Sequence, residues 1–191
     1  MTGVLRRPLP TGPTADPGSV TAVHQFLPAL LPGDAVGMHT LQVRRALRDA
    51  GLQSEIFVEA VHEELEGEAM HFSEFRHHAR GSVILYQLAT GSVLADEVFS
   101  RPEPLVIDYH NLTPAEFFRR WDPTVANAMG WARAQLSMLA PKTVIALADS
   151  AFNESELTEL EYRSTAVVPI LLDLDEMEAE VDGATVARLE A

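Results

Sequence analysis

His110 is the first residue whose position points to chemistry. It follows the apolar run "PLVIDY" (residues 104–109) and opens the polar loop "HNLTP", in which Asn111 is the next residue. A histidine at the carboxyl end of a strand can hydrogen-bond a ligand or transfer a proton near neutral pH. The alternative is a histidine that only caps the strand. We take His110 as the candidate catalytic residue and Asn111 as a candidate binding residue.

A second candidate is the glycine-containing loop "LPGDAVG", which holds Gly33, Asp34 and Gly37 between a strand-like run and a helix-like run. It is not a dinucleotide fingerprint, because G-x-G-x-x-G is absent, and it is not a P-loop, because no Gly-Lys-Ser/Thr follows. Glycines here can let a ligand approach the backbone while the following helix N-terminus faces it. The alternative is a tight turn, in which the glycines only satisfy the local backbone geometry.

The segment "HFSEFRHH" raises the question of a metal site. If it is helical, His71 and His78 share a face but lie roughly 10 Å apart along the axis, which is too far for one ion. His77 and His78 are adjacent and diverge. The chain has no cysteine, so a thiolate site is impossible. We expect no metal ion and no other cofactor.

Aromatic residues gather at Phe117, Phe118 and Trp121. They are suited to stacking on a sugar, but aromatic residues at helical spacing more often belong to the core, and we predict core positions. The acidic run over residues 173–182 is most simply one solvated face of a helix.

Composition sets wider limits on function. The 191 residues predict one domain, and the net charge of −14 argues against a nucleic-acid partner, which requires a basic footprint. Small anionic ligands remain compatible with it. No apolar run is long enough for a transmembrane segment, and the N-terminal residues lack the apolar core of a signal peptide. We therefore expect a cytoplasmic protein.

The elements that must position these residues alternate between strand and helix. Strands are predicted at residues 19–27, 54–60, 82–88, 104–109, 143–148 and 165–171, as nearly continuous apolar runs typical of a parallel sheet. A helix is predicted over residues 38–51. A second follows Asp122 and Pro123, an N-cap and a first-turn proline. Asn153 and Glu156 have the spacing of a capping box.

This alternation predicts an α/β fold: a Rossmann-like, doubly wound, mostly parallel sheet with helices on both faces. Ligands of such sheets bind at the carboxyl ends of the strands, where the strand order reverses. The loops that begin at Pro28, His110 and Asp149 are expected at that edge.

Three stretches together resemble a known family. They are "PGDAVGMHTLQVRRALRDAGLQSEIFVE", "VIDYHNLTPAEFF" and "VIALADSAFNESELTELEYRSTAVVPILLDLDE". The chain resembles the N-terminal half of retaining glycosyltransferases of the GT-B architecture, in glycosyltransferase family 4 (glycosyl transferase group 1). The resemblance implies a hexosyltransferase-type enzyme that transfers a sugar from a nucleotide-sugar to a glycan, lipid or small-molecule acceptor.

The resemblance also implies roles for individual residues. Gly33, Asp34 and Gly37 would approach the donor phosphates, and His110 would lie near the transferred sugar. Ser150 would line the same cleft. Family members do not generally require a metal ion.

The resemblance implies a division of the chain as well. Residues 1–19 are expected to be a disordered tail, residues 20–172 the Rossmann-like acceptor-side domain, and residues 173–191 the start of an interdomain linker. The donor-binding C-terminal domain of the family has no counterpart here, so we expect weak or no activity without a donor domain, in the same chain or in a separate one. The alternative is a stand-alone Rossmann-like module that binds a nucleotide or a partner without catalysis.

Overall fold

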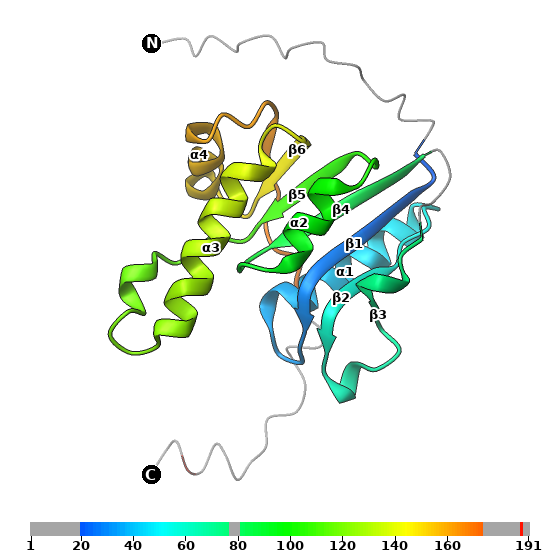
Figure 1. Cartoon of the computed structure of the whole chain (residues 1–191). Helices are drawn as coiled ribbons and strands as arrows, with labels where there is room; N and C mark the ends of the chain where they lie inside the picture. The colour runs from blue at the N-terminus through cyan, green and yellow to red at the C-terminus, as the bar shows by residue number, and fades with distance from the viewer. Residues whose placement is uncertain (1–19, 77–80, 174–187, 189–191) are drawn as a thin grey trace.

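The computed structural model describes residues 20–76, 81–173 and 188. In the described part, seven parallel strands form one sheet in the order β3-β2-β1-β4-β5-β6-β7 (Figure 1). The strands are β1 (Ala22–Leu30), β2 (Ile56–Val61), β3 (Met70–His71), β4 (Ser82–Leu88), β5 (Leu105–Tyr109), β6 (Thr143–Ala148) and β7 (Thr165–Val167). The predicted Rossmann-like, doubly wound α/β fold is confirmed.

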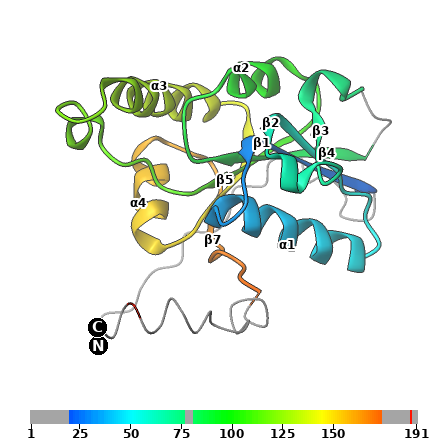
Figure 2. The same cartoon turned by 90° about the horizontal axis from the view of Figure 1, so that it is seen from below.

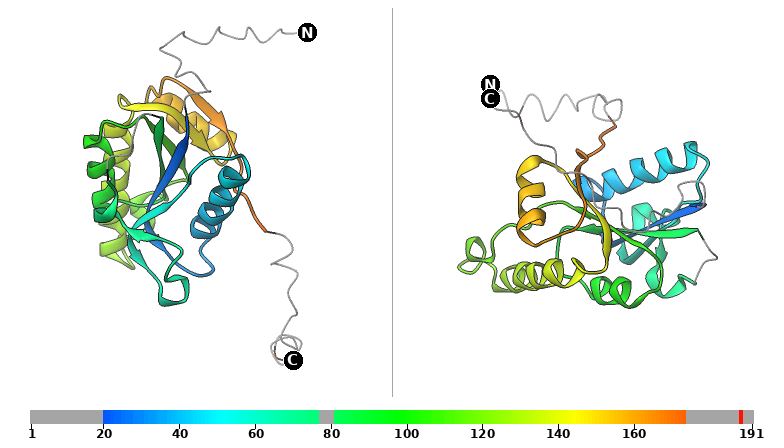
Figure 3. Two further views of the ribbon diagram at one scale, coloured as in Figure 1. Left: turned by 90° about the vertical axis from the view of Figure 1, so that its right-hand side faces the viewer. Right: turned by 90° about the horizontal axis from the view of Figure 1, so that it is seen from above.

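Helices cover both faces of the sheet. They are α1 (Ala35–Asp49), α2 (Val93–Ser100), α3 (Pro123–Leu139) and α4 (Ala151–Glu159), with short 3₁₀ turns η2 (Glu63–Leu65), η3 (Phe72–Glu74) and η4 (Ala115–Phe117). Helix α1 lies on one face, and α2 and α3 lie on the opposite face (Figures 2 and 3).

The strand order reverses between β1 and β4. From β1 the chain proceeds outward to β2 and β3, and it then returns to pair β4 with the other side of β1. Because all neighbouring pairs are parallel, the carboxyl ends of the strands share one edge. Ligands of doubly wound sheets bind at such a reversal.

The larger apolar core lies between the sheet and helices α2 and α3. It includes the buried side chains Phe26, Tyr86, Ile107, Leu94 and Leu136. A smaller cluster is formed by four buried residues of β1 and β2, with Leu41 of α1 packed against it.

Helix α1 presents polar side chains to the sheet. Its fully buried residues are Gly37, His39 and Thr40. Burial of a polar side chain is unfavourable unless it is hydrogen-bonded. The Thr40 hydroxyl donates to the backbone carbonyl of Val36 within the helix, whereas His39 finds its side-chain partner, Asp108, on strand β5.

Several element boundaries differ from those predicted. Strand β1 covers residues 22–30 instead of 19–27, and α1 begins at Ala35, after the N-cap Asp34, instead of at Met38. Helix α3 follows Asp122 and Pro123 as predicted, and the Asp122 carboxylate accepts hydrogen bonds from two backbone N–H groups.

Two local predictions are wrong. Helix α4 begins directly after Ser150, whose hydroxyl caps it, so Asn153 lies inside the helix and is no N-cap. Phe117 and Trp121 are 67% and 79% exposed and do not belong to the core. The physical reason is that they lie in η4 and the turn after it, a connection that projects beyond the end of the sheet (Figure 1).

Some predictions fall on residues outside the described part of the chain. These are the N-terminal tail (residues 1–19), His77 and His78, and the interdomain linker beyond residue 173. Within the described residues, no helix combines the length and the apolar character that crossing a membrane requires.

Candidate functional site

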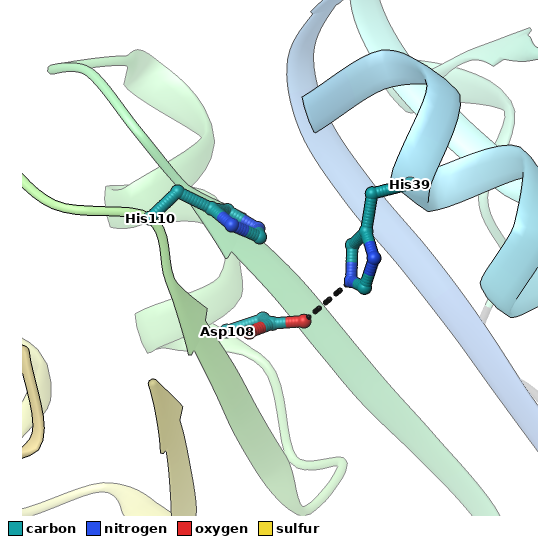
Figure 4. A group of neighbouring side chains, drawn as sticks. All are labelled: His39, Asp108 and His110. Atoms are coloured by element: carbon teal, nitrogen blue, oxygen red, sulfur yellow. Dashed lines mark hydrogen bonds and ion pairs between the residues drawn. The ribbon is translucent and has the colours of Figure 1, made fainter. Parts of the chain in front are cut away.

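Four titratable side chains meet at the carboxyl edge of the sheet. His110 directly follows β5 and Asp149 directly follows β6, while Asp108 belongs to β5 itself. The fourth, His39, reaches the edge from α1, and its ring centroid lies 5.4 Å from that of His110. Figure 4 shows Asp108 bonded to His39, with His110 beside them.

Both ring nitrogens of His39 are engaged. Nδ1 accepts a hydrogen bond from the backbone N–H of Leu171 at 2.8 Å, and Nε2 lies 3.0 Å from Oδ2 of Asp108. Because Nδ1 accepts, it carries a lone pair, and the ring proton of a neutral imidazole is then on Nε2. His39 therefore donates to Asp108.

Asp108 is buried with only part of its hydrogen-bonding capacity used. Its Oδ2 accepts from His39, but Oδ1 has no hydrogen-bond partner among the described residues. A buried carboxylate is costly unless it is paired, so His39 supplies an essential part of the stabilisation of this group.

His110 is also bonded through both of its nitrogens. Nδ1 lies 3.1 and 3.2 Å from the two carboxylate oxygens of Asp149, and Nε2 lies 2.5 Å from Oε1 of Gln87. The His110 side chain is 1% exposed, and that of Asp149 is 18% exposed. A ligand at this edge therefore reaches Asp149 more readily than the ring of His110.

Two buried glutamines connect His110 to α1. The Gln87 amide donates to Oε1 of Gln25 at 3.0 Å, and the Gln25 amide donates to the backbone carbonyl of Thr40 at 2.9 Å. These hydrogen bonds lead from the residue after β5 through β4 and β1 to α1, and they cross the strand reversal between β1 and β4.

His39, Asp108 and His110 have the spacing of a metal site. One ligand atom from each lies within 4.8 Å of the others. However, a histidine that binds a metal donates its second N–H to an acceptor, whereas Nδ1 of His39 accepts from Leu171. As bonded here, His39 has no lone pair left for an ion, and the cluster is a hydrogen-bonded network. The described partners of its members include no lysine or arginine.

The glycine loop lies at the same edge, between β1 and α1. Gly33 is exposed and has a φ of +73°, a backbone conformation that residues with a side chain rarely adopt. The carboxylate of Asp34 accepts from the backbone N–H of Gly37 at 2.8 Å and so covers the N-terminus of α1. A Cβ at Gly37 would lie 3.2 Å from the carbonyl oxygen of Leu31. The local backbone geometry therefore explains why both positions are glycine.

The two remaining candidates flank the cluster. Asn111 is exposed next to His110 and has a φ of +66°, in the left-handed region. Ser150 is exposed next to Asp149, and its hydroxyl accepts from the backbone N–H of Asn153 at 3.3 Å.

The site contains residues that sequence reasoning missed. They are His39, Asp108, Asp149, Gln25 and Gln87. Two signals were present. A glutamine interrupts each of the apolar runs "VHQFL" and "LYQL", and a buried glutamine in a strand requires a polar partner. In addition, His39 lies two residues after Gly37, inside the first of the three stretches that carry the family resemblance.

Behind this edge, Tyr109 anchors the loop that follows β5. Its hydroxyl donates to Oε2 of Glu156 at 2.6 Å and accepts from the backbone N–H of Leu112 at 3.2 Å. Burial raises the pKa of Tyr109 far above its ordinary value, and the bond to Glu156 raises it further. Tyr109 is therefore a neutral hydrogen-bonding group that holds the start of the loop in place.

No protein-family model matches the chain. No curated protein matches it either.

Proposed function

We propose that this chain is the acceptor-side domain of a nucleotide-sugar-dependent glycosyltransferase of the GT-B type. The observation that carries the proposal is the 5.4 Å approach of His39 to His110. It brings the glycine loop and α1 next to the strand-end histidine, at the point where the strand order reverses. The proposal also draws on the resemblance of the three sequence stretches to glycosyltransferase family 4.

The charges of the site support an acceptor-side role. Its titratable residues are two histidines and two aspartates, and the Asp34 carboxylate covers the N-terminus of α1. Carboxylates suit the hydroxyl groups of a sugar, because they accept strong hydrogen bonds. They do not suit a diphosphate. In the family that the chain resembles, most contacts to the donor phosphates come from a second domain.

Under this proposal the exposed residues at the edge surround the reacting sugar. Asn111, next to His110, and Ser150, next to Asp149, offer exposed polar groups, and Gly33 offers exposed backbone. The ring of His110 is almost fully buried, so we assign it the role of positioning Asp149.

The test is a titration of the ¹⁵N-labelled chain with a UDP-hexose and a GDP-hexose, observed by NMR. We expect dissociation constants on the order of millimolar, with shifts concentrated at residues 31–39, 110–113 and 149–152. The matching free nucleoside diphosphates are the control and should shift these residues less. Shifts confined to another surface would contradict the proposed site.

The same titration separates the proposal from its alternative. Micromolar binding of the free nucleotide, with no added effect of the hexose, would favour a stand-alone nucleotide-binding module. Weak binding that depends on the hexose favours the acceptor-side domain.

A further inference from the structure

We infer that His110 and Asp149 form a pair that holds one shared proton, in which Asp149 binds hydroxyl groups of the ligand and His110 is its positioning residue. The identity of the ligand as a sugar rests on the proposed function. The proton arrangement follows from the hydrogen bonds alone.

The first step is the orientation of the two buried glutamine amides. The backbone carbonyl of Thr40 can only accept a hydrogen bond, so the group of Gln25 that faces it is the NH₂ group. Oε1 of Gln25 then faces Gln87, which must donate with its own NH₂ group. Oε1 of Gln87 is consequently the atom that faces His110.

The second step is the proton on Nε2 of His110. Because Nε2 faces a carbonyl oxygen at 2.5 Å, it must donate, and it therefore carries a proton. Both glutamines are fully buried, so water does not compete for these bonds. Through the two intervening glutamine side chains, the backbone carbonyl of Thr40 thus determines that Nε2 of His110 carries a proton.

The third step concerns the opposite nitrogen. Nδ1 faces both carboxylate oxygens of Asp149, at 3.1 and 3.2 Å. A lone pair facing a carboxylate is repelled, so one proton lies between the two groups and belongs either to Nδ1 or to Asp149. The pair is neutral overall in both cases. The proton on Nε2 is held by its hydrogen bond to Gln87. The proton that can move is therefore the one between Nδ1 and Asp149.

The surrounding groups do not disturb this arrangement. His39 packs edge-on against His110, and its ring proton is directed to Asp108. Nδ1 of His39 accepts from Leu171. The hydrogen bonds of Asp149 among the described residues bring no second proton donor to it, and its side chain is 18% exposed at the carboxyl edge of the sheet.

The proton arrangement is tested by long-range ¹H–¹⁵N NMR of the histidine rings, with His110 assigned from the spectrum of His110→Asn. We expect Nε2 of His110 to carry a proton and Nδ1 to share one with Asp149. In Asp149→Asn, Nε2 should keep its proton while Nδ1 loses its own. Asp122→Asn, an N-cap change remote from the site, should leave the ring unchanged. A wild-type ring protonated on Nδ1 alone would overturn the inference.

The ligand role is tested by repeating the hexose-nucleotide titration with Asp149→Asn and Asp122→Asn. Loss of a charged hydrogen-bond acceptor should weaken binding roughly tenfold or more in Asp149→Asn only. Equal affinity in both variants would overturn the assignment of Asp149. If the parent chain binds no sugar nucleotide, the proposed function fails, and the ring spectra still decide whether the proton-sharing pair exists.

Discussion

His39 and Asp108 are 69 positions apart in the chain, yet their side chains meet at 3.0 Å inside the protein. The pair joins the first helix to the fifth strand. Nδ1 of the same histidine bonds the backbone of Leu171, beyond the last strand. One imidazole therefore connects three parts of the chain that flank the candidate site.

This pair leads to a prediction about stability. His39→Leu leaves Asp108 buried without its hydrogen-bond donor, and it should lower the free energy of unfolding by about 3–5 kcal/mol. Denaturant unfolding measures the change. The double variant His39→Leu/Asp108→Leu should recover part of the loss, because no charge then remains buried. Simple addition of the two single losses would show that the side chains are not coupled.

The exposed position of Trp121 leads to a second prediction. Because its side chain is 79% exposed, Trp121→Ser should change the free energy of unfolding by no more than about 0.5 kcal/mol. Leu136→Ala, a fully buried position of α3, should cost about 2–5 kcal/mol. Chemical denaturation of the two variants, side by side, checks the contrast. A large loss for Trp121→Ser would return that residue to the core.

A third prediction concerns alkaline pH. Burial raises the pKa of Tyr86, Tyr109 and Tyr162 far above the ordinary value of about 10. In the unfolded chain these hydroxyls lose their protons near pH 10, while the folded protein retains them. Stability should therefore be fully present below about pH 10 and should fall as the pH rises further.

Thermal unfolding followed between pH 8 and pH 12 measures this fall, and ultraviolet absorbance reports tyrosinate formation in the same samples. The two changes should occur together. Titration of all three tyrosines near pH 10 in a protein that stays folded would contradict their burial.

A fourth prediction concerns metal ions. Because both nitrogens of His39 are engaged with Leu171 and Asp108, added Zn²⁺ should not raise the melting temperature of the protein. Differential scanning fluorimetry with and without a chelator checks this. A rise that disappears in His39→Leu would instead show that the network opens to bind the ion.

The sequence alone predicted the framework of the molecule well. Continuous apolar runs such as "SVILYQL" and "TVIALA" indicate strands buried on both faces, and β4 and β6 have the predicted bounds. Helix α3 begins after Asp122 and Pro123, because capping is a local property of a few neighbouring residues. The spacing of Phe117 and Trp121 did not predict their exposure, because burial depends on which distant parts of the chain pack against a side chain.

The positions of His110, Asn111 and Ser150 at the carboxyl edge of the sheet also follow from the sequence, because each comes after an apolar strand. The sequence therefore determined the fold class and which residues follow the strands at the carboxyl edge of the sheet. The partners of His110 were decided only by the tertiary structure. His110 is bonded to Gln87 and Asp149, and Gln87 is bonded in turn to Gln25. These three residues come from three different strands or their ends, and parallel pairing across the strand reversal sets which of them meet. That register, and with it the position of each proton, depends on contacts between distant parts of the chain.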